Sequence, residues 1–84
     1  MSSLSNMPNI TDKLAIKLEQ AGIKSDQELK ILGAEKSFLL LLEVDPKAKL
    51  EHLYILEAAI EGIDVSKLSE VKKEELKMFY DICK

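Results

Sequence analysis

The stretch MPNITDKLAIKLEQAGI, residues 7–23, decides how this chain folds, because it contains a turn, a helix start, an apolar stripe and a helix stop in that order. Thr11 stands at an N-cap position, where a side-chain oxygen can accept from an exposed backbone N–H group. Leu14 and Leu18 follow one helical turn apart, on a face that can be buried. Gly22 can take the left-handed conformation that ends a helix. The stretch therefore predicts a capped amphipathic helix that follows directly on a tight turn.

The same kinds of signal recur along the rest of the chain. Ser25 and Glu28 have the spacing of a capping box, Asp45-Pro46 offers an N-cap followed by a proline at the first helical position, and Ser69 can cap a last helix. Gly33 and Gly62 are candidate helix stops. We expect five helices, over residues 12–21, 26–33, 34–43, 46–61 and 70–83. Their core-facing residues are expected to include Leu50, Leu53, Tyr54, Ile60, Val71, Leu76, Phe79 and Tyr80.

The composition is that of an all-α protein. The 84 residues include only three glycines and two prolines, and aromatic residues make up 5%, whereas good helix formers dominate. A chain of this size forms one domain with a modest core, because a small domain buries only about 60% of its unfolded surface. We predict a single domain, residues 1–84, that folds as a compact bundle of about five short helices, with residues 1–6 flexible.

Cysteine usage and apolar runs indicate where the chain works. Cys83 is the single cysteine, so an internal disulfide is excluded, and residues 1–6 lack the charged start and apolar stretch of a signal peptide. The longest apolar run, Phe38–Leu42, is far shorter than the roughly 20 residues that a membrane span needs. We therefore expect a cytoplasmic protein with no membrane contact.

The turn in the opening stretch has the spacing of a helix-hairpin-helix phosphate clamp, which suggests a helix-hairpin-helix or SAM-like bundle. Such a clamp uses two glycines, because backbone N–H groups approach a phosphate closely only where no Cβ intervenes. Asn9 and Thr11 occupy those two positions here. Asn tolerates left-handed backbone, but β-branched Thr resists it. Two alternatives remain for Asn9, Ile10, Thr11 and Lys13: a turn and cap that serve only the fold, or weak phosphate contact helped by the helix N-terminus.

The charge balance disfavours strong binding to nucleic acid. Twelve basic and fifteen acidic residues give a net charge of −3, whereas non-specific affinity for DNA comes mainly from an excess of positive charge. Every basic side chain is lysine, so the forked guanidinium that reads guanine edges is absent from the sequence. Binding to DNA, if it occurs, is expected to be weak and independent of base sequence.

Several short stretches occur in an order that points to a known family. They are Met7–Ile10, Ala21–Ile23, Leu29–Glu35, Leu53–Gly62 and Leu68–Ser69. Between Met7 and Glu75 the chain thereby resembles the C-terminal domain of TfoX (Sxy) competence regulators. The resemblance implies a helical bundle with a helix-hairpin-helix-like element and a part in regulating genes for DNA uptake. A separate N-terminal domain usually precedes this one in the family. The sequence does not contain that domain, so we expect a stand-alone copy.

Four positions depart from the pattern of that family. A glycine commonly stands where this chain has Thr11, a small glycine where it has Ala58, and basic residues where it has Leu40 and Leu42. Independently of the family, the helical period places Leu40 nearly opposite Phe38, and so away from the core. Either the helix is buried all round, or Leu39 and Leu40 form an exposed patch that binds a partner helix or a second copy.

Residues with catalytic or metal-binding chemistry are few. His52 has no second histidine nearby and is expected at the surface or its boundary. Glu57 and Glu61 share a helix face one turn apart, a spacing found in carboxylate metal sites but far more often in solvated pairs. Cys83 has no neighbouring base in the sequence. We therefore expect no enzyme activity, no metal, no cofactor and no small-molecule substrate.

The leading functional hypothesis is a non-catalytic regulatory interaction module, similar to the TfoX C-terminal domain, that acts through contacts with a protein partner or with itself. One alternative is a weak, sequence-independent DNA-binding module that uses the turn at Asn9–Lys13. A further alternative is a homo-oligomerisation scaffold. Electrophoretic mobility that changes with added DNA and with salt would favour the DNA-binding module. A molecular size that depends on protein concentration would favour the interaction module or the oligomerisation scaffold.

Overall fold

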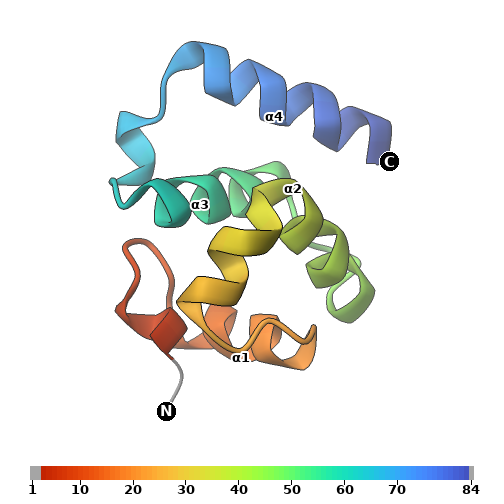
Figure 1. Ribbon diagram of the computed structural model, residues 1–84. Helices are drawn as coiled ribbons and strands as arrows, with labels where there is room; N and C mark the ends of the chain where they lie inside the picture. Colours follow the sequence, from red (N-terminus) through yellow and green to blue (C-terminus); the bar gives the residue numbers. More distant parts are fainter. Residues whose placement is uncertain (1–2, 84) are drawn as a thin grey trace.

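The computed structural model describes residues 3–83, which form four α-helices and two short 3₁₀ helices (Figure 1). No strand occurs in that range, so the predicted all-α class is confirmed. The middle helices α2 and α3 pack against each other, with α4 above them and α1 below in the view of Figure 1. The elements are η1 Ser3–Asn6, α1 Asp12–Gln20, α2 Asp26–Val44, α3 Leu50–Glu61, η2 Val65–Lys67 and α4 Glu70–Cys83.

Three helices begin at the serine or threonine predicted to cap them. The Oγ1 atom of Thr11 accepts from the Leu14 N–H at 3.2 Å. The Oγ atom of Ser25 accepts from the Glu28 N–H at 3.1 Å, and that of Ser69 accepts from the Lys72 N–H at the same distance. Each bond satisfies one of the backbone donors that the first turn of a helix leaves without an intrahelical partner.

Two helices end in the same way. Ile23 N–H donates to the Leu18 carbonyl at 2.9 Å beyond Gly22, and Ile63 N–H donates to the Ala58 carbonyl at 3.0 Å beyond Gly62. These six-to-one bonds define Schellman ends, and the isoleucine after each glycine folds back onto its own helix. Both predicted helix stops are therefore confirmed.

Helix α2 differs from the two separate helices that were expected. It runs from Asp26 to Val44 as one element, but Gly33 has φ 82° and ψ 165°, which lies outside the helical region. This conformation is open essentially to glycine alone. The predicted break at Gly33 is thus confirmed, as a kink between two helical halves.

The prediction that a helix begins at Asp45-Pro46 is wrong. Asp45 lies at the C-terminal end of α2, where its N–H donates to the Leu41 carbonyl at 2.7 Å. Its Oδ1 atom accepts from the Lys47 N–H at 3.2 Å, and its carbonyl accepts from the Ala48 N–H at 3.0 Å. Asp45 therefore closes a turn, which uses the same capping chemistry that was assigned to a helix start.

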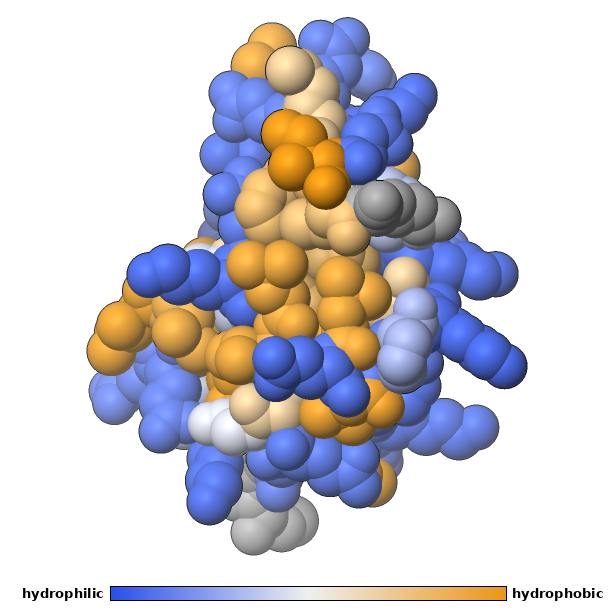
Figure 2. Space-filling model, turned by 90° about the vertical axis from the view of Figure 1, so that its right-hand side faces the viewer, coloured by the Kyte–Doolittle hydropathy of each residue, from blue (hydrophilic) through white to orange (hydrophobic). Residues whose placement is uncertain are grey.

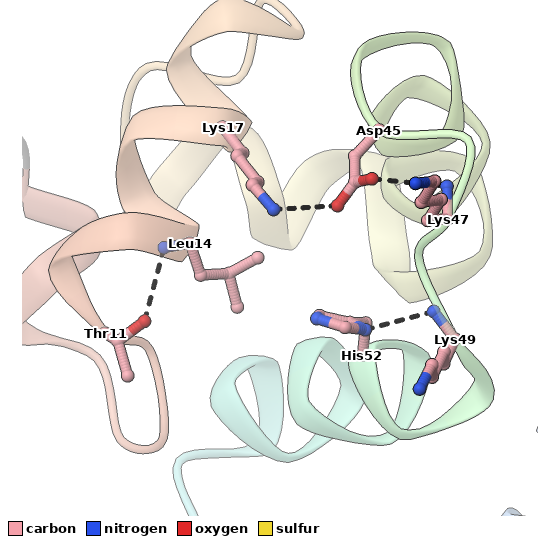
Figure 3. Close-up of polar contacts among 7 residues, drawn as sticks. All are labelled: Thr11, Leu14, Lys17, Asp45, Lys47, Lys49 and His52. Carbon is pink, nitrogen blue, oxygen red and sulfur yellow. Dashed lines mark hydrogen bonds and ion pairs between the residues drawn. The ribbon is translucent and has the colours of Figure 1, made fainter.

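Helix α3 begins at Leu50, four residues after the predicted first helical residue, Pro46. The residue before it, Lys49, donates its N–H to Nδ1 of His52 at 3.0 Å (Figure 3). The imidazole takes the place that a glutamate or glutamine side chain occupies in a capping box. His52 is half-buried, as expected for a boundary residue, and its role at this point is structural.

The core lies where α1, α2 and α3 meet under α4. Phe38 of α2 is fully buried, and its ring lies 5.8 Å from that of Tyr80 in α4 at an interplanar angle of 55°, within the range of favourable aromatic pairs. Leu53 and Leu76 are buried as expected, and five other expected core residues are half-buried against the cluster: Leu50, Tyr54, Ile60, Phe79 and Tyr80. Val71 was also expected in the core, but its exposed fraction is 67%.

The N-terminal segment holds part of the core as well. Residues 1–6 were expected to be flexible, but Ser3–Asn6 forms η1, and the Leu4 side chain within it has an exposed fraction of 0%. Residues 1 and 2 lie outside the described residues. A leucine in this short 3₁₀ turn anchors the start of the chain beside α1, since burying such a side chain contributes about 1.5–3 kcal/mol.

Candidate functional site

The turn ahead of α1 contains the residues that sequence analysis assigned to possible phosphate contact. The Ile10 N–H donates to the Met7 carbonyl at 3.4 Å, which places Pro8 and Asn9 at the two central positions of a turn. Asn9 has φ 68°, and among the described residues it is the sole non-glycine with a positive φ. Proline followed by a residue of positive φ is the pattern of a type II turn.

The side chain of Asn9 bonds across the fold. Its Nδ2 donates to the Ile63 carbonyl at 2.9 Å, and its Oδ1 accepts from the Val65 N–H at 3.3 Å. Both partners belong to the segment that joins α3 to α4, more than 50 positions away in the sequence. The amide therefore satisfies two backbone groups of a distant connection, and holds that connection against the turn.

The neighbours of Asn9 also serve the fold. Ile10 is buried in the core, and Thr11 caps α1 from extended backbone with φ −81° (Figure 3). Lys13 is exposed to solvent on the first turn of α1. Of the four residues assigned to possible phosphate contact, Asn9, Ile10 and Thr11 therefore have side chains with a structural role. The side chain of Lys13 has none among the described contacts.

A second lysine near the turn pairs with an acid. Nζ of Lys17 lies 2.7 Å from Oδ2 of Asp45, which links α1 to the end of α2 (Figure 3). The hydrogen bond from Lys17 holds the pKa of Asp45 below its ordinary value, and the Lys47 N–H acts in the same direction. This pairing reduces the positive charge that the N-terminal half could offer to a phosphate chain.

The apolar residues assigned to a partner surface lie on α2 beyond the kink. Leu39 has an exposed fraction of 44%, whereas Leu40 is half-buried against the core. With Leu32 and Lys36 they line a shallow hollow of about 260 Å³. Leu39 thus matches the expected exposed patch, and Leu40 forms its inner wall instead of pointing away from the core.

Glu57 lies at a second hollow, which sequence analysis did not identify. The hollow measures about 360 Å³, and helices α2, α3 and α4 line it near the Gly33 kink, with Glu57, Lys72 and Glu75 among its side chains. Partial burial raises the pKa of Glu57 to about 7, and a hydrogen bond with Glu61 acts in the same direction. The sequence could not predict this raised pKa, because the burial of Glu57 depends on how the three helices pack.

Other candidate chemistry is sparse in the part of the chain that the structure describes. No group of three or more His, Cys, Asp and Glu side chains in residues 3–83 could hold a metal ion. Cys83 has a free, half-buried thiol at the end of α4. No helix in the described range is long and apolar enough to cross a membrane.

Most of this chain is similar to known proteins. The family model of the TfoX C-terminal domain matches residues 1–80. Protein Sxy of Escherichia coli (strain K12) is 33% identical over 78 residues, which is 93% of this chain and 37% of Sxy. The chain therefore spans little more than a third of that relative.

Solved structures show the same fold. An uncharacterized protein from Listeria monocytogenes, in a triclinic crystal form, superimposes with a TM-score of 0.88 at 45% identity, and the match covers 90% of this chain and 86% of the other. A protein of unknown function from the same organism, in a tetragonal form, gives a TM-score of 0.92 at 41% identity over 95% of this chain and 99% of the other. With a family model that matches nearly the whole sequence, the chain belongs to the TfoX C-terminal domain family.

Proposed function

We propose that this domain is a non-catalytic regulatory module of the competence type, and that it acts through contacts with another protein. Membership of the TfoX C-terminal domain family and the likeness to Sxy support the regulatory part of the proposal. The observation that carries the protein-contact part is the internal use of the turn. A clamp presents successive backbone amides to a phosphate, whereas here the Ile10 N–H bonds to the Met7 carbonyl and the Asn9 side chain is bound to the rest of the fold.

Three bonds support this interpretation of the turn. Both polar atoms of the Asn9 side chain bind the connection between α3 and α4, and the Thr11 hydroxyl binds the first turn of α1. Moving Asn9 or Thr11 to meet a phosphate would break these bonds, and each buried group left unpaired costs about 1–3 kcal/mol.

Charge and apolar surface favour the same conclusion. The net charge is −3, and Lys17 is paired with Asp45, so attraction to a polyanion is weak. By contrast, Leu39 exposes apolar surface beside a hollow on α2. Exposed apolar side chains gathered at a hollow are a common feature of protein-binding surfaces.

A matched pair of variants tests the proposal. Purified protein, Leu39→Lys and Ile16→Lys would each be used as bait in native cytosol treated with nuclease. Ile16 is an exposed isoleucine on α1, with an exposed fraction of 56%, so its variant makes the same change on a different helix. We expect wild type and Ile16→Lys to retain the same protein, and Leu39→Lys to lose it by about tenfold, which corresponds to 1.4 kcal/mol.

Two outcomes would contradict the protein-contact proposal. One is equal retention by Leu39→Lys and Ile16→Lys. The other is a bait whose only specific companion is nucleic acid that disappears with nuclease. Sedimentation of the isolated protein at two concentrations separates self-association from contact with another protein. If a dimer forms through Leu39, the dimer fraction increases with protein concentration and is lost in Leu39→Lys.

A further inference from the structure

Helix α4 carries an apolar stripe that the fold leaves exposed. Val71, Met78 and Ile82 have exposed fractions of 67%, 66% and 82%. At about 100° per residue, these three positions fall within about 40° of one another around the helix. They make up half of the large apolar residues that are exposed in the described range, and are called the α4 stripe below.

The stripe is separate from the face by which α4 packs on the body. Leu76 is buried and Tyr80 lies against Phe38, more than about 100° round the helix from Val71. A surface helix normally carries one apolar face and a polar remainder. Helix α4 therefore has more apolar surface than its own domain covers, which is typical of a helix with an additional packing partner.

Carboxylates border the α4 stripe. Glu74 and Asp81 lie on one side of it, and Glu75 lies on the other, by the helical period. Glu75 faces Lys72 at 3.7 Å, whereas Glu74 and Asp81 form no ion pair within residues 3–83. The acidic row separates the stripe from Lys77, which lies further round. In Figure 2, apolar side chains form a band that descends from α4 over the helices beneath it, with hydrophilic residues on both sides.

This charge pattern identifies the occupant. We propose that the α4 stripe docks an amphipathic helix of a different protein, whose apolar face is flanked by lysine or arginine. Apolar contact would come from Val71, Met78 and Ile82, and the flanking cations would meet Glu74 and Asp81. Packing of an amphipathic helix on such a face is a common recognition mode, and charge complementarity selects its partner and orientation.

The same pattern disfavours a second copy of this chain. In an antiparallel pair of α4 helices, the row of Glu74 and Asp81 faces itself, and in a parallel pair it faces Glu75. Either arrangement brings carboxylates together in a chain of net charge −3. The docking proposal does not depend on Leu39, and it stands even if that surface binds nothing.

Two synthetic peptides provide the probe. Both are labelled 18-residue helices with the same leucine stripe, which lysines flank in one peptide and glutamates in the other. We expect fluorescence anisotropy to give an affinity for the lysine peptide about tenfold higher than for the glutamate peptide. Met78→Lys and Ile82→Lys should each abolish this difference. Ile31→Lys, which changes the exposed isoleucine of α2, should leave it intact.

Charge reversal separates local recognition from bulk attraction. The double variant Glu74→Lys/Asp81→Lys should bind the glutamate peptide better. The control Glu19→Lys/Glu43→Lys, which changes two exposed glutamates of α1 and α2 by the same total charge, should keep the preference for lysine. Circular dichroism of each variant checks that the fold persists.

Three results would overturn the proposal. They are equal affinity of the wild type for both peptides, the same reversal in the Glu19/Glu43 control, and a wild-type dimer that Met78→Lys dissociates. The last result would assign the stripe to a second copy.

Discussion

Asn9 links two parts of the chain that local sequence does not connect. It adopts left-handed backbone with φ 68°, and its side chain bonds to Ile63 and Val65. Among non-glycine residues, asparagine is one of those that best tolerate this conformation. A glycine would allow the turn but would supply neither bond, so asparagine satisfies both requirements.

Replacing Asn9 separates these two contributions. Asn9→Gly keeps the backbone freedom but loses both hydrogen bonds. It should lower the free energy of unfolding by about 2 kcal/mol, since each bond contributes about 0.5–1.5 kcal/mol. Asn9→Ala loses both bonds as well and places at φ 68° a residue that tolerates left-handed backbone less well than asparagine, so it should cost about 3 kcal/mol in total. Urea unfolding followed by circular dichroism measures both losses. Equal stability of Asn9→Gly and wild type would show that the two hydrogen bonds contribute nothing.

The sequence predicted the cap at Thr11 and the turn at Asn9, but not the long-range bonds of the Asn9 side chain. The Thr11 cap acts on Leu14, three residues away, so its role follows from local spacing. The bonds of Asn9 reach residues 54 and 56 positions away. No local pattern specifies such partners, because they depend on how the last two helices fold back over the first.

At the scale of one helix, Gly33 determines the shape of α2. Its φ of 82° and ψ of 165° allow two helical halves to meet at an angle, and a Cβ built there would have no neighbour within 4 Å. The requirement for glycine therefore comes from the backbone conformation and not from crowding. Gly62, with φ 75° and ψ 27°, lies instead in the left-handed helical region.

Alanine at these two glycines should have unequal effects. Gly33→Ala should cost about 3 kcal/mol, because its conformation is essentially limited to glycine. Gly62→Ala should cost about 1 kcal/mol, because L residues enter the left-handed region at that cost. Thermal and urea unfolding of the two variants measure the difference. A Gly33→Ala variant as stable as Gly62→Ala would show that the kink relaxes without strain.

The helix starts show where a local signal misleads. Ser25 and Ser69 cap helices as predicted, whereas Asp45-Pro46 closes a turn and Lys49 precedes α3. Aspartate before proline suits a turn as well as a helix start. In the structure the Asp45 carboxylate accepts from the Lys47 N–H and pairs with Lys17 of another helix, a contact that local sequence does not specify.

Across the whole molecule, packing of three helices gives Glu57 an altered titration. Burial raises its pKa from an ordinary 4.5 to about 7, and Glu61 and Glu35 add to the effect while Lys72 opposes it. The folded protein therefore binds this proton more tightly than the unfolded chain does. The resulting stabilisation is full below about pH 4.5 and is lost as the pH rises through about 7.

Glu57→Gln should remove most of this pH dependence. The amide resembles the protonated carboxyl group, so the variant should equal or exceed wild type in stability at pH 8, and the decline between pH 5 and 8 should flatten. The matching change at exposed Glu51 on the same helix should leave the decline in place. Asp45 and Asp64 have lowered pKa values and act below this window. An unchanged pH profile in Glu57→Gln would contradict the altered titration.

The sequence was sufficient for the class and order of the helices, but not for which faces the fold covers. Leu76 and Val71 lie on the same helix and were both expected in the core, yet one is buried and the other is exposed. Hydrophobicity alone cannot separate them, because helix α4 has two apolar faces. Which of them packs depends on the positions of α2 and α3.

The most decisive measurement is a titration of the ¹⁵N-labelled protein with a short DNA duplex at low salt, followed by amide chemical shifts. If the turn serves the fold, the backbone amides of Ile10, Thr11 and Lys13 and the side-chain amide of Asn9 will not move as DNA is added. Saturable shifts concentrated at those four residues, which weaken as salt is raised, would show instead that the turn holds a phosphate.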